Sequence, residues 1–120
     1  MLNYSFTKRT KPPYVLSITF EPELKFLSAY LFNICDRKSY EWVKAGINSV
    51  INREVEFVER DLEWYGAKIQ PETTVIYPTL EDGNLEGDVV RTEDFDSIIT
   101  IWFAEKERYD MLKNEINEQG

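Results

Sequence analysis

Residues 92–116 read TEDFDSIITIWFAEKERYDMLKNEI, and this stretch decides the fold. Its apolar side chains recur every three or four residues: Phe95, Ile98, Ile99, Trp102, Phe103, Tyr109, Leu112 and Ile116. The run IITIWF alone is also typical of a strand, but a period sustained over about 20 residues favours an amphipathic helix. Thr92 is a good N-cap, and the acidic residues after it complement the positive end of the helix dipole. We therefore predict a C-terminal helix whose apolar stripe covers one face of a sheet.

The segments before this helix have the two-residue period of strands. EVEFVE alternates acidic and apolar residues, and LEWYGAKIQ places Tyr65, Ala67 and Ile69 on one face with Trp64 and Lys68 on the other. TTVIY is rich in β-branched residues. The expected antiparallel strands are 54–59, 62–70, 73–77 and a fourth at about 88–91.

The N-terminal half predicts a strand pair followed by a helix pair. Residues 2–7 and 14–20 are strand-like and are separated by a polar loop that ends in two prolines. Pro22 suits the first turn of a helix, and Asp36 or Ser39 suits the cap of the next one, so the two helices read as an αα-hairpin. The expected fold is α+β, one domain over 1–120: an antiparallel sheet of four to six strands, an N-terminal helix pair and a C-terminal amphipathic helix packed against it.

Composition excludes several classes of protein. The chain contains no His, which excludes Ser-His-Asp triads, Cys-His pairs and HExxH zinc sites. Its one cysteine, Cys35, excludes an intramolecular disulfide and is expected to be a buried free thiol in a reducing cytoplasm. No signal peptide is recognisable and no window approaches the roughly 20 apolar residues of a membrane span, so we expect a cytoplasmic protein without a membrane partner.

The charge is distributed unevenly along the chain. Residues 1–60 contain nine Lys/Arg and seven Asp/Glu, whereas residues 61–120 contain five Lys/Arg and fifteen Asp/Glu. The net charge of −10 in the second half argues against direct binding of nucleic acid and favours a basic partner, although such charge also serves solubility. Within residues 81–96 only Arg91 offsets seven carboxylates, namely Glu81, Asp82, Glu86, Asp88, Glu93, Asp94 and Asp96.

The acidic segment 82–93 also fits the spacing of a calcium loop. The matching residues are Asp82, Asn84, Glu86, Gly87 and Glu93 at positions 1, 3, 5, 6 and 12. An EF-hand needs a helix before the loop, but the preceding TTVIYPTL is strand-like and interrupted by Pro78. A turn at Asp82-Gly83 followed by a helix start explains the same residues, so calcium binding is kept as an alternative and no cofactor is expected.

A binding surface is better supported than an active site. Carboxylate pairs such as Asp61 and Glu63 occur in glycosidases, but nothing separates this pair from a solvated face, and we expect no enzyme. Trp64 and Tyr65 lie beside these acids, and strand alternation puts the two rings on opposite faces. An exposed aromatic ring surrounded by acids suits an interface that receives Arg or Lys from a partner.

Three segments stand in a familiar order: EWVKAGINSVIN on a helix, TTVIYPTLEDGN on a strand and turn, and TEDFDSIITIWFAEKERYDML on the last helix. Over about residues 15–112 the chain resembles small bacterial immunity proteins of polymorphic toxin and contact-dependent growth inhibition systems. The resemblance implies a non-catalytic cytoplasmic antitoxin that binds a cognate toxin domain, often a basic nuclease. The resemblance does not identify which residues of this chain would bind the toxin.

From charge and aromatic placement we predict an immunity protein that neutralises its toxin through an acidic surface. The alternative is a calcium-binding or regulatory module that uses loop 82–93. The predicted partner-binding residues are Asp61, Glu63, Trp64, Tyr65, Asp82, Glu86, Asp88 and Asp94.

Overall fold

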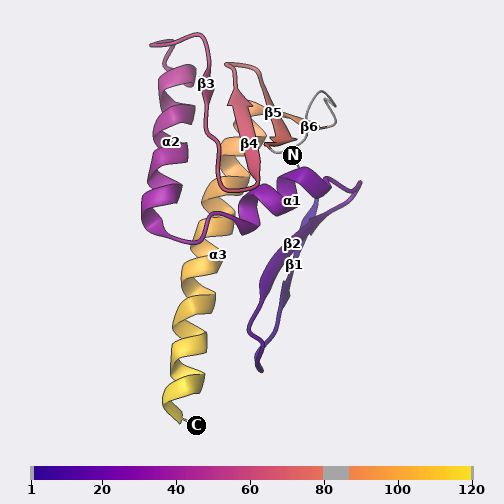
Figure 1. Ribbon diagram of the computed structural model, residues 1–120, viewed down its shortest axis with the longest axis vertical. Helices are drawn as coiled ribbons and strands as arrows, with labels where there is room; N and C mark the ends of the chain where they lie inside the picture. Colours follow the sequence, from indigo (N-terminus) through magenta and orange to yellow (C-terminus); the bar gives the residue numbers. More distant parts are fainter. Residues whose placement is uncertain (1, 80–86, 120) are drawn as a thin grey trace.

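The computed structural model describes residues 2–79 and 87–119 (Figure 1). It is an α+β structure with two antiparallel sheets, two shorter helices and a long C-terminal helix. The elements in chain order are β1 (Tyr4–Lys8), β2 (Leu16–Phe20), α1 (Lys25–Phe32), α2 (Arg37–Ile51), β3 (Val58–Glu59), β4 (Tyr65–Ile69), β5 (Thr73–Pro78), β6 (Asp88–Arg91) and α3 (Thr92–Gln119).

The strands form two separate sheets, not the single sheet expected from the sequence. β1 and β2 make a two-stranded hairpin, and β3 to β6 make a four-stranded sheet in simple sequential order. Helix α1 crosses between the two sheets, so they do not share a hydrogen-bonded edge within the described residues (Figure 1). In the larger sheet the alternation is as predicted: Ala67, Ile69 and Ile76 are buried on one face.

The two N-terminal helices are not the αα-hairpin that the sequence indicates. Helix α1 packs on β2 and on the four-stranded sheet, whereas α2 lies along α3. The α2–α3 contact contains a parallel stack of Tyr40 on Phe103, with ring centroids 4.5 Å apart, and an ion pair from Arg37 to Glu107. The helix pair is therefore split because each apolar stripe finds a partner far away in the sequence.

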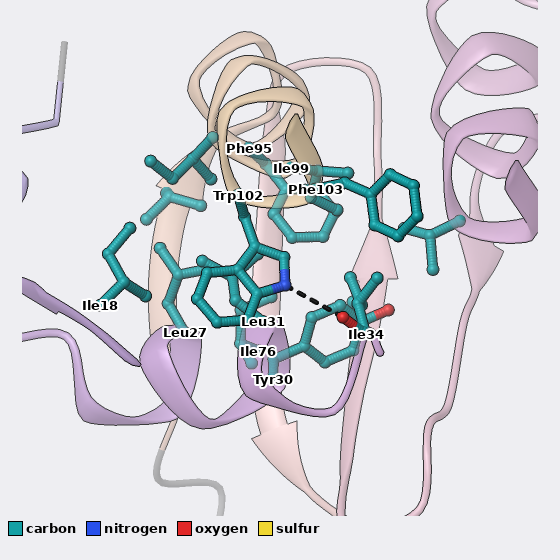
Figure 2. Close-up of a cluster of buried hydrophobic side chains, with 14 of the residues drawn as sticks. Ile18, Leu27, Tyr30, Leu31, Ile34, Ile76, Phe95, Ile99, Trp102 and Phe103 are labelled. Carbon is teal, nitrogen blue, oxygen red and sulfur yellow. Dashed lines mark hydrogen bonds between the residues drawn. The ribbon is translucent and has the colours of Figure 1, made fainter. Parts of the chain in front are cut away.

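Helix α3 supplies the centre of the core. Its buried residues include Phe95, Ile99 and Trp102, which meet Leu27 of α1 and Ile76 of β5 (Figure 2). The indole N–H of Trp102 donates a 3.0 Å hydrogen bond to the backbone carbonyl of Ile34, just beyond α1. The predicted helical period is confirmed, and the helix is longer than expected, with 28 residues.

Two local expectations are wrong. The EVEFVE segment forms a strand only at Val58–Glu59, and the apolar residues Val55 and Phe57 before it are exposed. Thr92 is the first residue of α3, but its hydroxyl donates to the carbonyl of Gln70 and bonds the hydroxyl of Thr74. It therefore ties the helix to the sheet instead of capping free N–H groups.

Candidate functional site

Three of the predicted site residues, Glu63, Trp64 and Tyr65, meet at the tip of the β3–β4 hairpin. The N–H of Leu62 donates to the carbonyl of Tyr65 at 2.8 Å, which leaves Glu63 and Trp64 as the two residues that turn the chain. Trp64 is 52% exposed, and its carbonyl accepts a hydrogen bond from the N–H of Thr79, which holds the tip in place. The indole is thus the exposed ring of the pair and the phenol of Tyr65 is half-buried, in contact with the core.

This tip lines a groove of about 900 Å³ together with β2 and α1. The strand β2 forms one wall, and Ser28, Ala29 and Phe32 of α1 contribute to the opposite wall. Phe32 and Trp64 are each 52% exposed, and both residues line the groove. Two large exposed rings at one concave surface are typical of the anchoring positions of a protein interface.

The groove is lined by acidic residues both where β2 leads into α1 and at the hairpin tip. Glu21, Glu23 and Glu63 line it and are exposed, with Lys25 as a counter-charge. The Lys25 ammonium group lies 5.1 Å from the centre of the Phe26 ring. Three carboxylates and two aromatic faces can accept Arg or Lys side chains through ion pairs and cation–π contacts.

No protein-family model, curated protein or solved structure matches this chain.

Cys35 also borders the groove and is exposed, so the expectation of a buried thiol is wrong. Apolar neighbours in the sequence suggested burial. However, α1 ends at Phe32, and the chain turns outward before Asp36 caps α2. Ile34 takes the buried position, and the residue after it faces solvent.

Asp61 lies away from the groove, on the outer face of the four-stranded sheet. Its carboxylate accepts a 2.8 Å hydrogen bond from the hydroxyl of Tyr77. Burial and then this hydrogen bond to a carboxylate raise the pKa of Tyr77 above its usual range. A Cβ at Gly66 would lie 2.1 Å from the Asp61 carboxylate, so glycine is required where these side chains meet.

The two described acids of the 81–96 cluster that were predicted as binding residues have different surroundings. Asp88 faces inward from β6, and its carboxylate accepts hydrogen bonds from the N–H groups of Phe26 and Leu27 at 2.8 and 3.0 Å. It therefore holds the N-terminus of α1, a structural role that its prediction as a partner-binding residue did not include. Asp94, at the start of α3, is half-buried and lines a smaller pocket with Leu2 and Val89.

Residues 82–86 of the proposed calcium loop, which include Asp82 and Glu86, lie outside the described residues, so the calcium alternative stays a prediction. Within residues 2–79 and 87–119, no group of three or more Cys, Asp or Glu side chains is arranged to hold a metal ion. Nor does any helix of these ranges combine the length and apolarity needed to cross a membrane.

Sequence analysis missed the β2–α1 side of the groove. The exposure of Phe32 could have been predicted from the sequence. Helix α1 buries Leu27, Tyr30 and Leu31, and Phe32 is a large aromatic residue that lies outside this apolar face. The contribution of β2 to the groove could not be predicted in this way. Apolar and polar residues alternate in a half-buried strand whether or not a second strand pairs with its other edge.

Proposed function

We propose that this chain is an immunity protein that binds and neutralises a basic toxin domain, with the groove as its main contact surface. The observation that carries the proposal is the convergence of Trp64 and Phe32 with Glu21, Glu23 and Glu63 on one concave surface. The rings provide apolar area at the centre of an interface, and the carboxylates attract cationic side chains. The net charge of −8 adds a long-range attraction for a basic partner.

Neutralisation in this proposal needs no catalysis by the immunity protein. A partner nuclease holds its substrate with a cationic surface, and an acidic protein bound over that surface excludes the substrate phosphates. The chain inhibits the toxin by covering its substrate-binding surface. It acts in the cytoplasm, because it has to bind the toxin before the toxin reaches its substrate.

The test is co-expression with a candidate toxin domain taken from a neighbouring gene, with cell growth and affinity for the purified domain as readouts. The wild-type chain should restore growth. Trp64→Ala should weaken toxin binding at least about 30-fold, as the loss of a buried interface tryptophan does. Trp42→Ala is the matched control: Trp42 is also exposed, but it lies on α2 outside the groove, so affinity should change less than about threefold.

Two results would overturn the proposal. One is growth arrest in the presence of a stable, well-expressed wild-type chain. The other is equal loss of affinity in the two tryptophan variants, which would place the interface away from the groove.

A further inference from the structure

Strand β2 has an edge to which no strand is paired within the described residues. It pairs only with β1, and the flanking bonds run from the N–H of Arg9 to Val15 O and from the N–H of Glu21 to Asn3 O. Hydrogen-bonded and non-hydrogen-bonded pairs alternate in an antiparallel ladder, so the odd-numbered residues of β2 bond to β1. The N–H and C=O groups of Leu16, Ile18 and Phe20 consequently point the other way.

The groove runs along this edge. It is lined by every residue from Ser17 to Glu21, a consecutive run that includes both faces of the strand. Because residues of both faces contribute, we infer that the groove borders the edge of the strand and not one of its faces. Leu16, Ile18 and Phe20 are buried in the core, which fixes the position of the strand beside the groove.

We propose that the groove binds an extended, basic segment of a partner protein, which adds to the edge of β2 as a third strand. Backbone hydrogen bonds to Leu16, Ile18 and Phe20 would supply affinity independent of the partner's sequence. Trp64 and Phe32 would receive apolar side chains, and the acidic residues that line the groove would receive Lys or Arg. The proposal deepens the proposed function: it rests on the groove being a partner site and names the form of the segment that enters.

A second copy of this chain is a poorer occupant of the same edge. Two molecules that each carry a net charge of −8 repel one another at long range, whereas a basic segment is attracted. An edge strand left open to self-pairing is also an aggregation hazard, which this charge opposes.

The test uses a synthetic peptide, acetyl-Lys-Val-Lys-Ile-Lys-Val-Lys-amide, with binding followed by NMR and by amide hydrogen exchange of the ¹⁵N-labelled protein. On saturation, exchange of the Ile18 and Phe20 amides should slow at least about tenfold, because N–H groups that gain a strand partner become protected. The amides of Ser17 and Thr19, which face β1, should change little. The acidic analogue with Glu in place of Lys should bind at least about tenfold more weakly.

Backbone pairing is separated from side-chain binding by N-methylation. Two analogues of the peptide are made, one N-methylated at the odd-numbered amides and one at the even-numbered amides. In an added strand only one of these two sets of N–H groups faces β2. Only the analogue that lacks this set should lose affinity, by at least about tenfold. Equal binding of the two analogues, or protection of β6 instead of β2, would overturn the proposal. So would a concentration-dependent dimer whose formation protects the same β2 amides.

A variant of the groove wall supplies the matched comparison. Ser28→Arg places a long cation in the groove and should abolish peptide binding, whereas Asn48→Arg adds the same side chain to an exposed position of α2 outside it. The peptide assay contains no toxin, so it can succeed when growth protection fails. Conversely, a neutralised toxin that leaves the Ile18 and Phe20 amides unprotected would support the proposed function and refute strand addition.

Discussion

Two tryptophans of this chain show how the same side chain serves opposite purposes. Trp102 is 1% exposed, stacks on Phe6 and bonds to the carbonyl of Ile34, so it connects the N-terminal hairpin, α1 and α3. Trp64 is anchored at the hairpin tip by a hydrogen bond to its backbone carbonyl, and it is 52% exposed. One ring holds the core together and the other is free to be covered by a partner.

Replacing each tryptophan with alanine should therefore separate stability from binding. Trp102→Ala should lower the free energy of unfolding by about 3–5 kcal/mol, since it leaves a large cavity and an unpaired carbonyl. Trp64→Ala should change it by about 0.5 kcal/mol or less, as is usual for an exposed position. Urea unfolding followed by circular dichroism measures both, and comparable losses would show that Trp64 is part of the packed structure.

Asp88 is a second residue whose role differs from its prediction. Asp88→Ala should destabilise the protein by about 1.5–3 kcal/mol, because two N–H groups at the start of α1 lose a charged acceptor. Asp88→Asn should cost less, because it keeps an oxygen acceptor. Glu93→Gln is the control: it removes a nearby charge from an exposed ion pair with Arg91 and should change stability by about 0.5 kcal/mol or less. A loss in Asp88→Ala no larger than in this control would argue against the helix-holding role.

At the scale of elements, helix α2 depends on one carboxylate at its start. The N–H of Ser39 donates to Asp36 at 2.7 Å, and this bond lowers the pKa of Asp36 below 3.8. A carboxyl group with a lower pKa in the folded state adds stability at higher pH. That contribution is lost as the pH falls from 3.8 through the folded-state pKa.

The Asp36→Asn variant should test this sign directly. Wild type should be more stable than the variant at neutral pH, and the difference should shrink below pH 3.8, because asparagine caps a helix without titrating. Thermal unfolding of the two proteins over this range measures the difference. A constant difference across the range would mean that the Asp36 carboxylate does not interact more favourably in the folded state.

Elements whose pattern is sustained could be predicted, and those that depend on distant partners could not. The period of α3, the alternation of β4 and the short strand at residues 88–91 are confirmed. The pattern of EVEFVE is as regular as that of β4. However, residues 54–57 lie outside the ladder that begins at Val58 and have no sheet partner among residues 2–79 and 87–119. Local periodicity records which face is apolar, but not whether a neighbouring strand is present.

At the scale of the whole molecule, the N-terminal hairpin is attached along α3 and apart from the larger sheet (Figure 1). Phe6 stacks on Trp102, Lys8 pairs with Glu105, and the hydroxyl of Tyr109 donates to the carbonyl of Arg9. These contacts lie at successive turns of the helix. The hairpin, which supplies the β2 wall of the groove, is therefore held by these side chains of α3 as well as by α1, which packs on β2.

Weakening the contact between the N-terminal hairpin and α3 should destabilise the two-stranded sheet more than the four-stranded sheet. Tyr109→Phe should cost about 0.5–1.5 kcal/mol and speed amide exchange in β1 and β2 more than in β4 and β5. Tyr14→Phe is the control: its hydroxyl makes a longer, exposed 3.3 Å bond to Asn117 near the end of α3. Uniform acceleration in both sheets would show instead that the molecule opens as one unit.

The candidate site could be predicted from the sequence only in part. Glu63 and Trp64 stand out because an aromatic residue and acids adjoin, and the structure places them at the groove. The other wall comes from residues 17–35, which reach the tip at residues 63–65 only because α1 passes between the two sheets. Asp61 and Asp88 were predicted from charge and aromatic placement in the sequence, which do not indicate which face of a strand a residue occupies.

The position of Cys35 at the groove gives this protein a built-in chemical reporter. It is the only cysteine in the sequence, and its thiol is exposed at the groove wall. The rate at which a maleimide alkylates it should fall when anything occupies the groove, and that rate can be read by mass spectrometry on the unmodified chain. Candidate partners can then be ranked by how well they shield one sulfur atom, before any of them has been identified.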